Sequence, residues 1–188
     1  DADYLIMESV YGDRNHESRD SRRQILARVI QDNYQRQGTL IIPTFSLERS
    51  QELLFELDAL HEGKHIPVMP IFFDSPLAIR LTEVFKQHKS YFNEAAQKAI
   101  SPGKYLFDFP GLHNTLKTEE SKMIVTVPGP KIVIAGSGMS TGGRVVHHEK
   151  NYLPDPNNTL LLTGYQAIGT PGRLIEEGLK KVHITGED

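Results

Sequence analysis

The sequence predicts an α/β fold built on a mainly parallel β-sheet of about six strands, with helices on both faces. Three observations favour this class. Short apolar, β-branched runs alternate with longer segments of helical periodicity, and glycine, proline or polar turns separate them. The chain's 188 residues also suffice for one domain with a sizeable core. Such strand-helix-strand units form parallel sheets through right-handed crossovers.

Each predicted strand is an apolar run that ends at a turn or a polar residue. The runs cover residues 4–7, 39–42, 66–73, 132–135, 159–163 and 182–185. Because parallel strands end at the same edge of a sheet, the polar residues that follow them should share one rim, where such sheets bind ligands. A helix cap or a turn explains each cluster taken alone. The clusters are Glu8, Thr44-Phe45-Ser46, Asp74-Ser75, Ser137-Gly138 and Tyr165-Gln166.

Helices are predicted between these strands from apolar positions spaced three and four residues apart. The first presents Leu26, Val29 and Ile30 on one face and stops at Gly38. Ser75 is suited to cap a helix whose first residue is Pro76. The predicted helices cover residues 21–37, 47–62, 76–88, 93–100, 119–125 and 172–179, and a further one contains Arg144.

The composition limits which partners the chain is expected to bind and in which cellular compartment it is expected to work. A net charge of −3 and a pI near 6.3 argue against a broadly basic surface for nucleic acid, so any polyanion should be held locally. The chain has no cysteine, which excludes a disulfide framework and a thiolate zinc site and fits a cytoplasmic location. No apolar run approaches the ~20 residues of a membrane helix, and no signal peptide is visible.

The strongest chemical signal lies in residues 131–150. The strand over 132–135 breaks at a glycine-rich turn, and a helix containing Arg144 follows. Such a turn presents backbone N–H groups at a helix N-terminus, where the helix dipole favours an anion, and its glycines let a ligand approach closely. We therefore expect this turn to bind phosphate.

Other motifs compete for the same turn. The dinucleotide pattern GxGxxG fails because Gly142 comes one position late. The phosphate loop GxxxxGK[ST] fails because Arg144 and Val145 replace the lysine and the hydroxyl. The nucleophile pattern GxSxG fits in letters and would make Ser140 the nucleophile of a serine hydrolase, although Gly136 and a serine separate it from the strand. A purely structural turn also stays open.

The histidines do not form a metal centre by their spacing. His61 and His65 fit the zinc-protease pattern HExxH in letters, but Gly63 ends the predicted helix between them. His147 and His148 are adjacent, so on a helix their side chains point about 100° apart. No stretch supplies the clustered His and Asp ligands of a hydrolytic metal centre.

Several short motifs follow one another along nearly the whole chain. They are Glu8-Ser9-Val10-Tyr11-Gly12-Asp13-Arg14, Ile42-Pro43-Thr44-Phe45-Ser46 with Arg49 and Gln51, Asp74-Ser75-Pro76-Leu77-Ala78, Ser137-Gly138-Met139 with Gly142-Gly143-Arg144, and Gly164-Tyr165-Gln166 through Gly169-Thr170. Together they resemble the β-CASP region of metallo-β-lactamase-fold ribonucleases, most of all the bacterial and archaeal relatives of the messenger-RNA 3′-end cleavage endonuclease. Their shared order makes this resemblance more specific than any single motif.

The resemblance implies a zinc-dependent ribonuclease as the parent protein. In this family the β-CASP domain is inserted in a two-zinc hydrolase domain, and RNA enters the cleft between the two for phosphodiester hydrolysis. We therefore expect two zinc ions in the parent enzyme, no metal ligand in this chain, and no activity of the isolated chain. The expected partners are RNA and the metallo-β-lactamase-fold domain of the same polypeptide.

The resemblance also implies roles for individual residues. Glu8 matches an acidic motif whose carboxylate orients a histidine of the catalytic centre. The sequence departs from the family pattern at Val10, where threonine is usual, at Glu48, where glycine is usual before Arg49, and at Pro171, where leucine is common. The residues expected to contact RNA or its phosphates are Thr44, Phe45, Ser46, Arg49, Asp74, Ser75, Ser137, Gly138, Met139, Gly142, Gly143 and Arg144.

The resemblance divides the chain into three parts. Residues 1–16 are expected to be a boundary strand and loop of the metallo-β-lactamase-fold part, residues 17–180 the β-CASP domain, and residues 181–188 the start of the return. Two alternatives remain beside the ribonuclease: a serine hydrolase that uses Ser140, and a non-catalytic module that binds RNA or another phosphorylated ligand.

Overall fold

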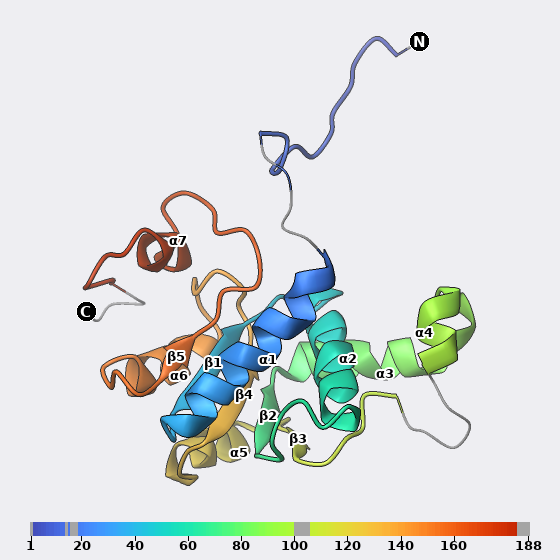
Figure 1. The fold of residues 1–188 in the computed structure, drawn as a ribbon. Helices are drawn as coiled ribbons and strands as arrows, with labels where there is room; N and C mark the ends of the chain where they lie inside the picture. Colours follow the sequence, from blue (N-terminus) through green and yellow to red (C-terminus); the bar gives the residue numbers. More distant parts are fainter. Residues whose placement is uncertain (1, 14, 16–18, 100–105, 184–188) are drawn as a thin grey trace.

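The computed structural model describes residues 2–13, 15, 19–99 and 106–183 (Figure 1). Its centre is a parallel five-stranded sheet with the strand order β3-β2-β4-β1-β5. This confirms the predicted α/β class, with five strands in place of about six. The strands are β1 (Thr39–Pro43), β2 (Ile71–Asp74), β3 (Leu112–Asn114), β4 (Lys131–Ala135) and β5 (Thr159–Leu160).

Helices cover both faces of this sheet. One face packs against α1, α2 and α3, and the opposite face packs against α6 and the short η2. The helices are α1 (Arg19–Gln35), α2 (Arg49–Glu62), α3 (Pro76–Gln87), η1 (Lys89–Tyr91), α4 (Glu94–Ala99), α5 (Thr118–Met123), η2 (Ile124–Thr126), α6 (Arg144–Tyr152) and α7 (Pro171–Glu176). Within the described ranges, none is long and apolar enough to cross a membrane.

The central strand β4 explains why the sheet needs two helical layers. All five of its residues are buried. Ile132 and Ile134 pack with α1 and α2, whereas Val133 and Ala135 pack with α6, because side chains alternate between the faces of a strand. A strand that is apolar on both faces is stable only between two covering layers.

The connections open a crevice at the carboxyl edge of the sheet. The chain leaves β1 and β2 toward α2 and α3 on one face, but it leaves β4, which lies between them, toward α6 on the other face. Pro43 and Asp74 both pair with Ala135, so the turns after the three strands begin at the same level. This register confirms that these turns share one rim.

Two of the predicted strands differ from the structure. Residues 4–7 form no strand, and their apolar side chains are 69–99% exposed, because no described strand lies beside them to complete a ladder. The run over 66–73 is extended but pairs only from Ile71 onward, since Pro67 and Pro70 lack the N–H that a ladder requires.

The ends of the sheet also differ from the prediction. The edge strand β3 was missed, since its three residues include the polar His113 and Asn114 and give no period-two signal. Residues 182–183 form no strand, and 184–185 lie outside the described residues.

The helix signals of the sequence are confirmed more closely. Ser75 caps α3 by accepting a hydrogen bond from the Ala78 N–H at 3.4 Å, and Pro76 is the first residue of this helix. His61 lies on α2, whereas His65 lies beyond its end, so the HExxH pattern does not share one helix. The three-part division at residues 16 and 180 stays a prediction.

Candidate functional site

The glycine-rich turn between β4 and α6 is held by bonds within itself. The Ser137 N–H donates to the Gly142 carbonyl at 3.2 Å, and the Ser137 hydroxyl lies 2.9 Å from the Thr141 hydroxyl. Gly143 has a φ of 77°, and a β carbon there would lie 2.6 Å from the Gly136 oxygen. Only glycine suits such a position without strain. The turn is therefore a closed, defined structure and not a loose linker.

This turn delivers an open helix N-terminus to the rim. α6 begins at Arg144, its N-cap is Gly143, and no side chain caps it. The Val145 N–H donates to the Gly136 carbonyl at 2.9 Å, so the turn itself satisfies one of the first N–H groups. The space beside Gly142 is also open, because a β carbon built there meets no atom within 4 Å. A helix N-terminus of this kind favours an anion through its remaining N–H groups and its dipole.

Ser140 lies inside the turn and not on its surface. Its side chain is fully buried, and its hydroxyl donates a hydrogen bond to Oε1 of Glu149 on α6. Burial raises the pKa of Glu149 to about 7, although the Ser140 hydrogen bond opposes the shift. A hydrolytic nucleophile must be reached by its substrate and needs a base beside it. The structure gives Ser140 no approach path, so it contradicts the serine-hydrolase alternative.

Asp74, at the end of β2, is the centre of a buried polar cluster. Its Oδ1 accepts from Arg144 at 2.7 Å, and its Oδ2 lies 2.6 Å from the Ser121 hydroxyl and 2.7 Å from His148 Nε2. Burial alone would raise the pKa of Asp74, but the hydrogen bonds from His148, Ser121 and Arg144 hold it below its ordinary value. The carboxylate is therefore ionised and fully used within the protein.

The guanidinium of Arg144 is directed inward by the same cluster. Besides Asp74 it contacts the carbonyls of Thr115 at 2.9 Å and Leu116 at 3.0 Å. Asp74 has no exposed surface and Arg144 keeps 19% of its side chain exposed. An internal ion pair therefore engages both residues, so the structure lends no support to a phosphate contact by either one, and those contacts stay predictions.

Two further predicted contacts lie below the surface. Thr44 is buried, accepts a hydrogen bond from Ser50 at 3.0 Å and donates its N–H to the Ala135 carbonyl at 2.9 Å. Ser75 is buried as the cap of α3. These side chains fix the shape of the turns, and Thr44 also lines the pocket described below. Their contact with RNA stays a prediction.

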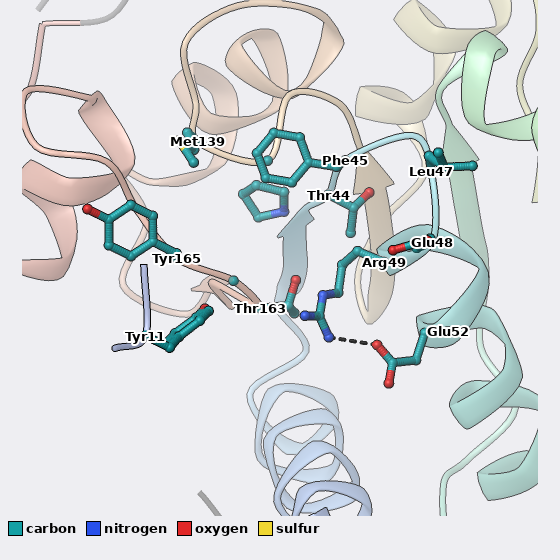
Figure 2. A pocket seen from close by; sticks show the side chains of 13 residues that line it. Tyr11, Thr44, Phe45, Leu47, Glu48, Arg49, Glu52, Met139, Thr163 and Tyr165 are labelled. Atoms are coloured by element: carbon teal, nitrogen blue, oxygen red, sulfur yellow. Dashed lines mark hydrogen bonds and ion pairs between the residues drawn. The ribbon is translucent and has the colours of Figure 1, made fainter. Parts of the chain in front are cut away.

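A pocket of about 350 Å³ lies on the β1 side of the rim (Figure 2). Phe45 and Arg49 line it from the segment after β1, Met139 from the glycine-rich turn, and Tyr165 from the loop after β5. Ser46, beside Phe45, is half-buried and its carbonyl accepts from Gln51 at 3.2 Å. The pocket therefore gathers predicted residues from two turns that are distant in sequence.

Tyr11 closes one side of this pocket from the N-terminal segment. Its ring meets the Tyr165 ring edge to face, with the centroids 6.2 Å apart and the planes at 75°. On the opposite side, Arg49 donates to Glu52 at 2.7 Å (Figure 2). The sequence prediction did not include Tyr11, Tyr165 or Glu52 among the contacts, although both tyrosines stand within the motifs that carried the resemblance.

Gly138 joins the turn to its surroundings. Its carbonyl accepts from the buried Gln166 amide at 3.1 Å, and Gln166 also donates to the Gly164 carbonyl at 3.0 Å. A β carbon at position 138 would lie 2.7 Å from the Phe45 ring. Gln166 therefore positions the turn, a role that the sequence did not predict, although Gln166 follows a predicted strand and belongs to the motif Gly164-Tyr165-Gln166.

The backbone at Glu48 explains the usual glycine of the family pattern. Glu48 has a φ of 64° and a ψ of −65°, and the Arg49 N–H donates to the Leu47 carbonyl at 2.8 Å. This three-residue γ-turn is strained for any residue with a β carbon. It also delays the start of α2 from the predicted residue 47 to Arg49.

The described part of the chain holds no metal site. Among its residues, no three His, Cys, Asp or Glu side chains are grouped so that they could bind a metal ion. Glu8 is exposed, and its carboxylate accepts from the Val10 N–H. Its action on a catalytic histidine stays a prediction, because the histidine would belong to another part of the polypeptide.

Comparison with known proteins agrees with this architecture. A family model described as the Beta-Casp domain matches residues 50–175. The chain is 39% identical over its full length to ribonuclease TTHA0252 of Thermus thermophilus and covers 43% of that protein.

Relatives from two further organisms are similar over almost the whole chain. Transcription termination factor FttA of Methanosarcina mazei is 32% identical over 98% of the chain, which covers 29% of that protein. Endoribonuclease ysh1 of Schizosaccharomyces pombe is 31% identical over 98% of the chain, which covers 24% of that protein. The chain thus spans less than half the length of these relatives. It belongs to the β-CASP domain family of metallo-β-lactamase-fold nucleases, as the motifs predicted.

Proposed function

We propose that this chain forms one wall of the RNA-binding cleft of a zinc-dependent ribonuclease, and that its glycine-rich turn binds RNA phosphate. The observation that carries the proposal is the uncapped N-terminus of α6 at the carboxyl end of the central strand. Relatives named ribonuclease and endoribonuclease support a substrate with a phosphodiester backbone.

The turn would bind phosphate through its backbone and not through an arginine. The guanidinium of Arg144 is paired with Asp74, so it adds no free charge at the rim. The Val145 N–H already donates to the Gly136 carbonyl, so the donors would be the other first N–H groups of α6, beside Gly142 and Gly143. Together with the net charge of −3, this predicts that a few local contacts carry the affinity.

The ligands of the catalytic metal would come from another part of the polypeptide. The described residues offer no suitable ligand group, and the chain covers 43% or less of the relatives named above. Two zinc ions in the parent enzyme would supply the nucleophile for hydrolysis. Glu8 would orient one of their histidine ligands, and the isolated chain would bind RNA weakly without cleaving it.

Gly142 allows a direct test in the full-length polypeptide. A side chain fits there without contact, so Gly142→Asp adds a negative charge beside the open helix end and Gly142→Asn is its neutral match. We expect Gly142→Asp to weaken single-stranded RNA binding about tenfold in low salt, as expected for a lost charge-assisted contact, while Gly142→Asn stays within about twofold of the wild type. Fluorescence anisotropy at two salt concentrations measures both. Equal affinities for the two variants would contradict the phosphate site.

The full-length polypeptide also allows a test of zinc-dependent RNA cleavage. We expect a chelator to abolish RNA cleavage by the full-length protein and added zinc to restore it. If RNA binds while zinc restores no cleavage, the parent protein is an RNA-binding module and the ribonuclease proposal fails.

A further inference from the structure

We propose that the 350 Å³ pocket on the β1 side of the rim binds one nucleobase of single-stranded RNA and excludes phosphate. This rests on the proposed RNA-binding function and specifies which chemical group of the RNA enters the pocket. The aromatic walls, the sign of the charges and the size of the pocket each support it.

The walls of the pocket are aromatic and apolar. Phe45, Met139, Tyr11 and Tyr165 come from four separate segments, and Figure 2 shows them around one space. Phe45 keeps 47% of its surface exposed although it is large and apolar. Proteins hold single-stranded RNA by stacking unpaired bases on exposed aromatic side chains.

The Phe45 ring is held in position before any ligand arrives. It packs against the backbone of Gly138 so closely that a β carbon at that residue would lie 2.7 Å from the ring. A ring fixed in this way loses little freedom when a base stacks on it, which favours binding.

The charges of the pocket disfavour phosphate. Among the described residues that line it, the charged ones are Glu48, Arg49 and Glu52, which are two carboxylates and one guanidinium. Glu52 is paired with Arg49 at 2.7 Å and with Arg22, outside the lining, at 2.6 Å. A phosphate would meet two carboxylates and an arginine that is already paired, whereas a neutral base carries N–H groups that can donate to a carboxylate.

The size and position of the pocket fit one base beside one phosphate. Its volume lies near the lower end of the ~300–1,000 Å³ typical of small-ligand pockets, which suits one base and not a stacked run. Gly138 and Met139 line it, while Gly142 and Gly143 lie at the open end of α6. One turn thus offers a base contact at its start and a phosphate contact at its end.

The test compares two RNA probes in the full-length polypeptide. One is a labelled single-stranded oligonucleotide, and the other has the same length and phosphates but lacks all bases. Phe45→Leu keeps an apolar side chain and removes the ring, and Tyr165→Leu does the same on the facing wall. We expect each variant to bind the intact oligonucleotide at least fivefold more weakly than the wild type, and the abasic one within twofold.

The outcomes separate this proposal from the function on which it rests. If the wild type binds both probes and the variants bind the intact oligonucleotide normally, the base pocket is wrong while RNA binding stands. An equal loss on both probes would assign the rings a purely structural role and also overturn the pocket. If the wild type binds neither probe, the RNA-binding function fails together with it.

Discussion

The two sides of the central strand β4 carry polar turns that look alike in sequence and are used in opposite ways. On the β2 side, Asp74 is fully buried and accepts hydrogen bonds from Arg144 and Ser121. On the β1 side, Phe45 is half-exposed and Glu48 lies in strained backbone beside an open pocket. A charged residue at a strand end is therefore a candidate ligand only where the protein has not already satisfied it.

Of the variants considered, we expect Asp74→Ala to change the stability of the folded chain most. Asp74→Ala removes the shared acceptor of Arg144, Ser121 and His148, and leaves the partly buried guanidinium without its counter-charge. Loss of one partner of a buried ion pair costs about 3–5 kcal/mol of the free energy of unfolding. Urea denaturation measures this cost.

The exposed pair Lys86–Glu83, with its charged atoms 2.8 Å apart, provides the control for Asp74. Glu83→Ala should cost less than about 0.5 kcal/mol, because solvent screens an exposed pair on a helix surface. If Asp74→Ala costs no more than this control, the β2 side is not the structural cluster described above.

The next largest change in stability concerns Glu149 on α6, which accepts a hydrogen bond from Ser140 of the glycine-rich turn. Its pKa is about 7 in the folded chain against an ordinary value of 4.5. Below pH 4.5 both states are protonated, so the group does not affect stability. Between pH 4.5 and 7 the unfolded state ionises first, so the folded state loses roughly 3 kcal/mol as the pH rises, and the loss levels off above pH 7.

Glu149→Gln isolates this effect, because the glutamine oxygen still accepts from Ser140 and does not titrate. We expect the wild type to be more stable at pH 5 than at pH 7 by roughly 2 kcal/mol relative to this variant, because part of the loss has already occurred by pH 5. Urea denaturation at both pH values measures the difference. Other titrating groups are common to both proteins and cancel in the comparison. Parallel pH profiles would show that Glu149 is not protonated in the folded chain.

The sequence predicted the centre of the fold because its strands are continuous apolar runs. β1 and β4 lie within one residue of their predicted bounds, and their register places the polar turns on one rim. The edge strand β3 is short and half polar, so its pairing depends on β2 and gives no local signal.

The use of each rim residue could not be read from the sequence. Asp74 and Arg144 stand 70 residues apart, and nothing local to either one reveals that they neutralise each other. Likewise the Tyr11–Tyr165 contact joins the two ends of the described chain. Motif order therefore pointed to turns that lie on one rim, but only the packing separates their structural residues from those that face the pocket.

The smallest change in stability that we predict is on the β1 side of the rim, at Glu48, whose backbone is strained. Its φ of 64° is a conformation that glycine adopts freely, so Glu48→Gly should relieve strain in the folded chain. Part of the gain is lost because glycine makes the unfolded chain more flexible, so we expect a net stabilisation of about 0.5–1 kcal/mol. Glu48→Ala removes the same carboxylate without relieving the backbone and should show no such gain. If urea denaturation finds the alanine variant as stable as the glycine variant, the γ-turn stores no strain, and the pocket side differs from the Asp74 cluster in exposure alone.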